Sequence, residues 1–420
     1  MEIEKLKVYI QSANINFLFG SGLSRPYLAT LGNIEDWLMR LSRTEKSLND
    51  QERMLLRASI YREYYNTVML PNLDKSDNKL EDYRSTMENY KKFFMIWNEI
   101  INKRRNTLLP KQINLYSTNI DVFTEKAAEE TRIEFNDGFK GSIKPIYDES
   151  NFQKSYRKTS LHFQNITEIP VFNYLKMHGG INWTLTDDFR ITNDCSLNIV
   201  RSIKEVLMSI DAHFFVDLNV ELKDVGNSVE KKKSDIIWEE LIKRTRTIFK
   251  EISKQNDFDW GILNKFMNEY HKMIMINPTK AKFRETVNDL HFYELMRLYS
   301  NSLEKETSIL FVMGFSFADE HIANITLRAA NSNPTLLIYI FAHTEKDKEY
   351  YEKNLFKNNQ AINNNIQIVT PENFNKKNQE YFKNRASWDT ITNFDFLSIN
   401  RVFEEISKMI PVSFNYGNRY

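Results

Sequence analysis

Polar residues suited to binding a nucleotide follow several apolar runs in this sequence. The run 15–19 leads into Gly20-Ser21-Gly22, with Ser24 close behind. Glycines directly after a buried strand allow a tight turn and a close approach of the backbone to a pyrophosphate. The same pattern also occurs in ordinary turns that bind no ligand, and the third glycine of the usual dinucleotide fingerprint is absent. This turn therefore indicates a phosphate site only in combination with other motifs.

A second motif, Thr118-Asn119-Ile120-Asp121, follows the apolar run 113–116. Asn119 offers an amide donor and an acceptor, and Asp121 offers an acceptor. Ligands of doubly wound folds lie beyond the carboxyl ends of the strands, where this motif would stand. Residues of these types also favour helix N-caps, and a helical stretch follows at 125–130. Taken alone, the motif favours capping.

A histidine stands at the end of a third apolar run, in Lys176-Met177-His178-Gly179. Because imidazole titrates near neutrality, His178 is suited to act as a base or proton relay. A single histidine at a strand end is more often structural. The order of the motifs changes that balance: a glycine turn, then Thr-Asn-x-Asp, then His-Gly, each after a successive predicted strand.

The fourth motif is the segment with Gly314, Ser316 and Asp319, which follows the apolar run 309–313. A glycine and a helix N-terminus at this place suit a phosphate or a ribose. The alternative is an ordinary strand, turn and helix in which Asp319 is the N-cap. On its own, the alternative is the better interpretation.

Apolar runs without alternation predict the elements that position these motifs. Such runs, separated by helix-like stretches, are typical of a parallel sheet covered on both faces. We therefore expect an α/β fold, a Rossmann-like doubly wound parallel sheet with a helical subdomain formed by insertions. The predicted strands are 15–19, 113–116, 174–177, 273–276, 309–313 and 336–341, with a seventh at 366–369.

Two long charged segments with apolar residues at helical spacing interrupt this pattern. We assign 34–107 and 196–270 to helical insertions that form a second subdomain. The remaining segments, 1–33, 108–195 and 271–420, form the predicted nucleotide-binding domain.

Composition excludes several classes of protein. The chain has 420 residues, and its 57 Lys and Arg balance 56 Asp and Glu, so no excess of positive charge favours direct nucleic-acid binding. One cysteine, Cys195, excludes an internal disulfide and a multi-cysteine zinc site, and we expect no metal. No apolar run is long enough to cross a bilayer, and no secretory signal is evident. We expect a cytoplasmic protein without a membrane partner.

In this order, the motifs resemble those of the sirtuin-like superfamily, in the divergent branch found in bacterial anti-phage defence systems. Gly20-Ser21-Gly22-Leu23-Ser24 is similar to the family's Gly-Ala-Gly-x-Ser. Thr118-Asn119-Ile120-Asp121 is similar to a shortened Thr-x-Asn-x-Asp, and the His178-Gly179 pair to the family's catalytic His-Gly. Residues 276–280 and 314–322 look like later segments of the defence branch. The resemblance covers about half the chain.

The resemblance implies that NAD is the substrate and that its nicotinamide–ribose bond is hydrolysed. Asn119 would hold the ribose and a water, Asp121 would accept from the nicotinamide carboxamide, and His178 would take a proton. The residues expected to bind phosphates and the adenosine ribose come from two turns and their flanks: Gly20, Ser21, Gly22, Ser24, Thr118, Gly314, Ser316 and Asp319.

Two features of protein deacylases are missing from the sequence. The stretch Arg25-Pro26-Tyr27 lacks the family's cover segment, and one cysteine cannot form the four-cysteine zinc module. We therefore favour an NAD hydrolase that depletes NAD in anti-phage defence, by abortive infection. The alternatives are an NAD-dependent deacylase and a non-catalytic subunit that binds NAD or a related nucleotide in an ATPase complex. Because such a hydrolase is toxic, we expect restraint by homo-oligomerisation or by a HerA-type ATPase partner.

Overall fold

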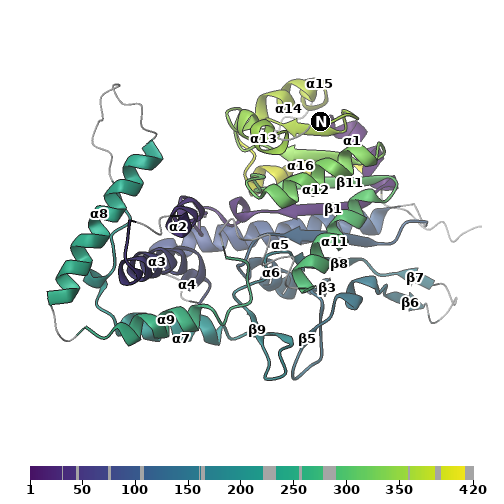
Figure 1. The fold of residues 1–420 in the computed structure, drawn as a ribbon. Helices are drawn as coiled ribbons and strands as arrows, with labels where there is room; N and C mark the ends of the chain where they lie inside the picture. Colours follow the sequence, from purple (N-terminus) through teal and green to yellow (C-terminus); the bar gives the residue numbers. More distant parts are fainter. Residues whose placement is uncertain are drawn as a thin grey trace, which may run out of the picture. The chain divides into compact units, whose positions relative to one another are not determined.

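The fold is seen in a computed structural model that describes residues 1–30, 32–43, 47–73, 77–104, 108–159, 161, 166–220, 233–254, 258–277, 290–357, 360–383 and 389–411 (Figure 1). The chain divides into two compact units. Unit 1 consists of Met1–Tyr27, Lys79–Gly179 and Thr286–Tyr420, and unit 2 of Leu28–Asn78 and Gly180–Glu285.

Unit 1 is built on a seven-stranded sheet with the order β13-β12-β11-β1-β2-β8-β3, in which every neighbouring pair is parallel. The chain adds β2, β8 and β3 on one side of β1 and then returns to add β11, β12 and β13 on the other. The direction of winding therefore changes between β1 and β11. The strands are β1 (Asn14–Phe19), β2 (Gln112–Ser117), β3 (Glu134–Asn136), β8 (Val171–Lys176), β11 (Ser308–Met313), β12 (Leu337–Phe341) and β13 (Ile366–Val369).

This sheet confirms the predicted Rossmann-like α/β fold, and six of the predicted apolar runs form its strands. The predicted strand at 273–276 is wrong, because Met275 forms only an isolated bridge there. Met273, Met275 and Ile276 are buried within unit 2, so the apolar character of this run reflects packing of an irregular segment. β3 is not among the predicted strands; it is an edge strand of three residues whose first residue is exposed.

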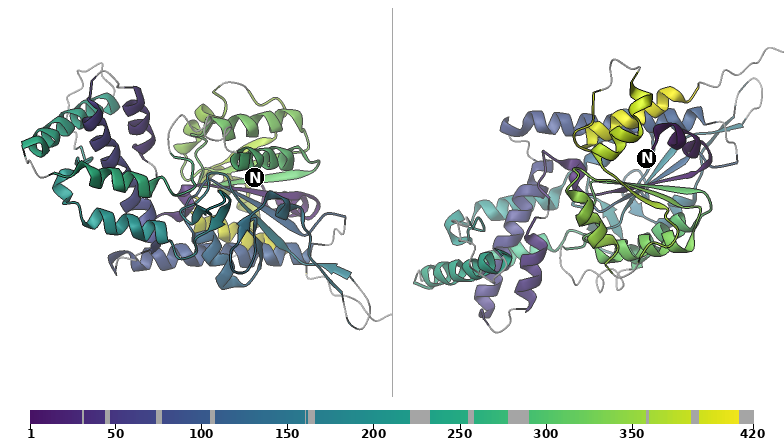
Figure 2. Two further views of the ribbon diagram at one scale, coloured as in Figure 1. Left: turned by 60° about the horizontal axis from the view of Figure 1, so that its bottom comes forward. Right: turned by 90° about the horizontal axis from the view of Figure 1, so that it is seen from above.

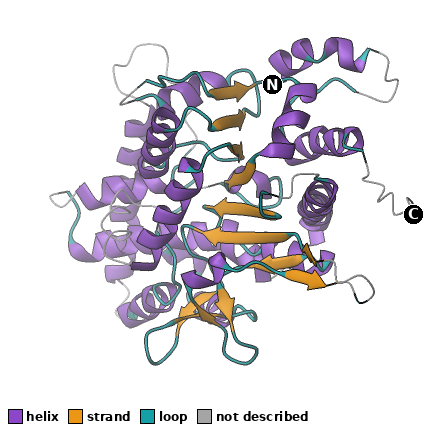
Figure 3. Ribbon diagram, turned by 90° about the vertical axis from the view of Figure 1, so that its right-hand side faces the viewer, coloured by secondary structure: helices purple, strands orange, loops and turns teal. Residues whose placement is uncertain are grey.

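Helices cover both faces of the sheet, as Figure 3 shows. On one face, Phe17 of β1 lies edge-on to Phe93 and Trp97 of α5 and to Phe403 of α16. On the other face, Tyr116 of β2 packs against α11, and Figure 2 shows the green α11 and α12 opposite the yellow α16. The helices of unit 1 are α1 (Ile3–Ser12), α5 (Leu80–Lys103), α6 (Phe123–Thr131), α11 (Leu290–Glu304), α12 (Glu320–Ser332), α13 (Asp347–Leu355), α14 (Pro371–Lys377), α15 (Gln379–Phe382) and α16 (Phe396–Met409).

A row of asparagines crosses four strands of the sheet on the α11 side. The strand register places Asn16, Asn114, Asn173 and Asn136 side by side on β1, β2, β8 and β3. Each amide nitrogen donates to the oxygen of the next side chain at 3.0 Å, from Asn136 through Asn173 and Asn114 to Asn16. Because an unpaired buried amide is costly, a slip of any strand would break this row. The asparagines therefore specify the strand register.

Two small β hairpins and short helical turns complete unit 1. The pair β4 (Phe139–Lys140) and β5 (Ile146–Tyr147) and the pair β6 (Arg157–Thr159) and β7 (Ile166–Glu168) are antiparallel. The 3₁₀ turns are η1 (Ser21–Ser24), η3 (Asp77–Lys79), which begins in unit 2, and η4 (Glu149–Gln153).

Unit 2 is mainly helical. At its centre the ring of Tyr61 from α3 stacks on Tyr270 from α9, with centroids 4.4 Å apart. Arg40 on α2 bridges to Asp235 on α8 at 2.7 Å. Its elements are α2 (Ile34–Arg43), α3 (Asp50–Tyr64), the π turn η2 (Tyr65–Met69), α4 (Leu70–Leu73), β9 (Trp183–Leu185), β10 (Ile191–Asn193), α7 (Asn198–Met208), η5 (Ala212–Phe214), α8 (Lys233–Lys254) and α9 (Trp260–Tyr270).

The predicted insertion 34–107 spans residues of both units, because α5 packs against the sheet of unit 1 and the helices before it lie in unit 2. The predicted insertion 196–270 lies within unit 2. No described helix combines the length and the apolar character that a membrane crossing requires.

Candidate functional site

The polar motifs meet at the carboxyl edge of the sheet. Just past the strand ends, backbone hydrogen bonds join each turn to the strand or turn next to it. The turns after β11, β1, β2 and β8 therefore lie side by side along this edge. These bonds are Gly20 N to Met313 O at 3.0 Å, Thr118 N to Phe19 O at 3.1 Å, and Met177 N to Ser117 O at 2.8 Å. The edge includes the point where the winding reverses, which is the usual ligand position of such sheets.

The glycine turns after β1 and β11 lie against each other. The Gly22 amide donates to the Gly314 carbonyl at 3.0 Å. A Cβ atom at Gly20 would lie 2.4 Å from the Gly314 oxygen, and Gly314 has a φ of +63°. Glycine is therefore required by close backbone packing at both turns. Ser21 and Ser316 are half-buried on these turns.

Asn119 and Asp121 are joined to the first turn through Tyr90 on α5. The Ser24 hydroxyl donates to Asp121 Oδ2 at 2.7 Å and lies 3.0 Å from the Tyr90 hydroxyl. Asn119 Nδ2 donates to the same tyrosine oxygen at 3.4 Å. Asn119 Oδ1 is buried and has no hydrogen-bond partner among the described residues. The network therefore holds Asn119 in place and leaves its acceptor unused.

Asp121 also supports the chain around it. Its Oδ1 accepts the Phe123 amide at 3.1 Å in a local turn before α6, whose N-cap residue is Val122 and carries no side-chain cap, so no residue of the motif is the N-cap of this helix. Burial raises the pKa of the Asp121 carboxyl, while the Ser24 hydroxyl and the Lys176 ammonium oppose that rise. Both carboxyl oxygens thus have a protein donor.

A buried ion pair lies beneath this loop. Lys176 Nζ, at the end of β8, donates to Glu125 Oε1 at 2.6 Å and to the Asp121 carbonyl at 2.7 Å. The Lys176 side chain is 2% exposed and that of Glu125 is 17% exposed. Burial raises the pKa of Glu125, and the nearby ammonium lowers it. Lys176 therefore joins β8 to the loop that carries Asn119.

His178 faces Asp319 across the edge. His178 Nε2 lies 3.3 Å from Asp319 Oδ2, and both side chains are at least nine-tenths buried. The two groups are within ion-pair distance, but their angles do not form a hydrogen bond, so Nε2 has no hydrogen-bond partner in the described part of the chain. Asp319 Oδ1 caps α12 by accepting the amides of His321 and Ile322. One carboxylate thus caps a helix and faces the imidazole.

The structure brings the predicted residues to one edge in two groups. Ser24, Asn119 and Asp121 form one group with Tyr90, and His178 and Asp319 form the other. Thr118 is half-buried and donates to the Phe19 carbonyl through its hydroxyl at 3.3 Å. Of the matched segment 276–280, residues 278–280 lie outside the described residues.

Sequence reasoning missed Tyr90 and gave no role to Lys176 and Glu125. Tyr90 lies in a helix whose apolar stripe predicts packing, and nothing in its spacing marks the hydroxyl as polar support for Asn119. The Lys176–Glu125 pair joins residues 51 positions apart. A lysine inside an apolar strand is the signal that points to such a pair.

Comparison with models of known protein families finds no match to this chain, and comparison with curated proteins finds none either. Within the described ranges, no group of three or more His, Cys, Asp or Glu side chains is arranged to hold a metal ion.

Proposed function

We propose that the protein hydrolyses the nicotinamide–ribose bond of NAD at the carboxyl edge of its sheet. The observation that carries the proposal is a pair of unused groups there, Asn119 Oδ1 and His178 Nε2, both buried and without a hydrogen-bond partner among the described residues. Buried polar atoms are normally paired, and exceptions gather at sites that receive a ligand. The two groups follow neighbouring strands, β2 and β8.

The chemistry needs little beyond positioning and a base. As the bond breaks, its electron pair goes to the cationic pyridinium nitrogen, so nicotinamide leaves as a neutral molecule and the ribose becomes oxocarbenium-like. A water then bonds to the ribose carbon and loses a proton. Asn119 would orient the water and the ribose through its free acceptor, and His178 would take the proton. Asp319, 3.3 Å from His178 Nε2, would stabilise the imidazolium that results.

The two glycine turns support the placement of the rest of the substrate. Backbone amides at a glycine turn after a strand suit a pyrophosphate. The turns at Gly20-Ser21-Gly22 and at Gly314 lie at the point where the winding of the sheet reverses, with Ser316 and Asp319 beyond the second turn. Asp121 keeps lone pairs beside its two protein donors, and we assign these to the nicotinamide carboxamide.

The decisive experiment follows nicotinamide and ADP-ribose by chromatography after incubation of the full chain with NAD. We expect release by the wild type and a loss of about 10²–10⁴-fold in rate for His178→Ala and Asn119→Ala. His213→Ala is a matched control, because that histidine is exposed in unit 2 and lies 2.8 Å from the neighbouring Asp211. Release at the wild-type rate by both site variants would refute the proposal. NAD binding without turnover would support a non-catalytic subunit, and release that requires an acylated peptide would support a deacylase.

On the resemblance alone, we further propose that this activity serves anti-phage defence through NAD depletion. Induced expression of the wild type in bacteria should then lower the NAD pool and stop growth, and His178→Ala should do neither. Restraint by self-assembly or by a HerA-type ATPase belongs to the same proposal. A chain that sedimented as a monomer and was fully active without a partner would contradict it.

A further inference from the structure

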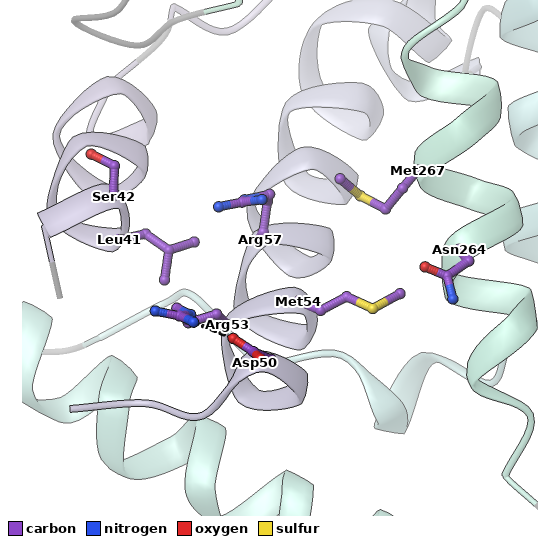
Figure 4. A pocket seen from close by; sticks show the side chains of 8 residues that line it. All are labelled: Leu41, Ser42, Asp50, Arg53, Met54, Arg57, Asn264 and Met267. Carbon is purple, nitrogen blue, oxygen red and sulfur yellow. Dashed lines mark hydrogen bonds and ion pairs between the residues drawn. The ribbon is translucent and has the colours of Figure 1, made fainter. Parts of the chain in front are cut away.

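Unit 2 contains a cavity of about 720 Å³ between α2, α3 and α9, which the NAD proposal does not use (Figure 4). This volume is in the range of pockets that hold small organic ligands. All of the described residues that line it belong to unit 2. They are Leu41, Ser42, Asp50, Arg53, Met54, Arg57, Asn264 and Met267.

Two arginines make one end of this cavity positive. Arg53 and Arg57 stand four residues apart on α3, and Figure 4 shows their guanidinium groups on the side towards Leu41 and Ser42. Asp50 pairs with Arg53. Arg57 makes no ion pair with a described residue. The residues three and four positions away from it on α3 include no carboxylate; they are Arg53, Met54, Ile60 and Tyr61.

Like charges four residues apart on a helix repel each other, and among the described lining residues one carboxylate, that of Asp50, accompanies the two guanidinium groups. The described lining side chains therefore carry a net positive charge. An anion with several acceptor oxygens would relieve this repulsion. Guanidinium groups favour phosphate, because their planar fork donates two parallel hydrogen bonds.

The opposite end of the cavity has a different chemistry. Figure 4 shows Met54 and Met267 on the side towards α9, with the Asn264 amide next to them. Thioethers form favourable contacts with aromatic rings, and a carboxamide can pair with the polar edge of a nucleobase. A ligand that spans the cavity would therefore have an anionic end and a flat, polar-edged aromatic end.

We propose that this cavity is a second ligand site of the protein, for a phosphorylated nucleoside. The phosphate lies on Arg57 and Arg53, and the base lies between Met54 and Met267 with its edge towards Asn264. The proposal does not depend on NAD hydrolysis, since none of the described residues that line this cavity belongs to the carboxyl edge of the sheet.

Titration calorimetry of the full chain with adenosine monophosphate, adenosine and inorganic phosphate tests the site. We expect adenosine monophosphate to bind, and the other two probes to bind at least tenfold more weakly, because each meets only one end of the cavity. Arg57→Gln should weaken the binding of adenosine monophosphate at least tenfold, and Arg57→Lys by less, since lysine retains the charge without the fork. Arg57 is exposed, so these variants should fold.

Arg201→Gln is the matched control, because Arg201 is an exposed arginine of unit 2 outside the cavity. It should bind like the wild type. Absence of binding, unchanged binding by Arg57→Gln, or an equal loss in Arg201→Gln would overturn the proposal. Phosphate binding as tightly as the nucleotide would overturn the assignment of a nucleoside.

Discussion

Replacement of Lys176 by methionine tests how the fold supports the loop that carries Asn119. The ammonium group makes hydrogen bonds of 2.6 Å to Glu125 and 2.7 Å to the Asp121 carbonyl, in surroundings that leave its side chain 2% exposed. Methionine retains most of the volume and removes both donors. The variant therefore tests the contribution of the charge and the hydrogen bonds of Lys176 while its packing stays nearly the same.

Removal of one partner from a buried ion pair costs about 3–5 kcal/mol, because the remaining charge is buried without compensation. We expect Lys176→Met to lower the stability of unit 1 by this amount at pH 8. The double variant Glu125→Leu with Lys176→Met should recover most of the loss, since apolar replacement of a whole pair is often close to neutral. The Asp121 carbonyl would still lack its donor, which leaves a deficit of about 1 kcal/mol.

The loss should depend on pH, because burial already raises the pKa of Glu125 above its ordinary value of 4.5. A carboxyl group whose pKa is raised on folding stabilises the folded state at pH values below its pKa in the unfolded chain. This contribution to the free energy of unfolding disappears as the pH rises through the pKa of the group in the folded state. The Lys176 ammonium lowers the pKa of Glu125, so its removal raises that pKa further. A larger fraction of Glu125 is then neutral at acidic pH, so the destabilisation should be smaller at pH 5 than at pH 8.

Hydrogen exchange detected by mass spectrometry is the appropriate assay, since a chain with two compact units need not unfold in one step. Peptides from β8 and α6 should exchange about 10²–10⁴-fold faster in Lys176→Met at pH 8, after correction for the intrinsic rate. Peptides from α8 and α9 in unit 2 are the internal control. An effect below tenfold, or an equal effect at pH 5 and pH 8, would refute the assignment of a buried, charged pair.

Two further variants address the support of the site. Tyr90→Phe removes the hydroxyl that contacts Ser24 and Asn119 and retains the packed ring. We expect about tenfold slower nicotinamide release with a nearly unchanged unfolding midpoint. Unchanged kinetics would exclude a positioning role for Tyr90. Gly314→Ala places a side chain at a φ of +63° and 2.7 Å from the backbone of the neighbouring turn, whereas at Gly32, with a φ of +52°, the nearest atom is 3.9 Å away. Gly314→Ala should therefore lower the melting temperature more than Gly32→Ala, and equal shifts would show that the close packing of the turns is unimportant.

The predicted motifs lie at one edge because each follows a strand of the same parallel sheet. That much follows from local patterns, since apolar runs predict buried strands and parallel strands end at a common edge. The run 273–276 shows the limit of this reasoning. A buried irregular segment and a buried strand have the same apolar composition, and only hydrogen bonding separates them.

By itself, the sequence determined the type of sheet, the position of the polar motifs after its strands and the need for glycine at its turns. Only the tertiary structure decided which of these residues touch. Tyr90 reaches Ser24 and Asn119 because α5 packs across β1, and four asparagines align because their strands pair in one register. The reason is physical: local sequence sets the conformation of a segment, whereas a side chain's partners depend on packing between segments far apart in the chain. The pairing of His178 with Asp319, 141 positions away, is set in this way.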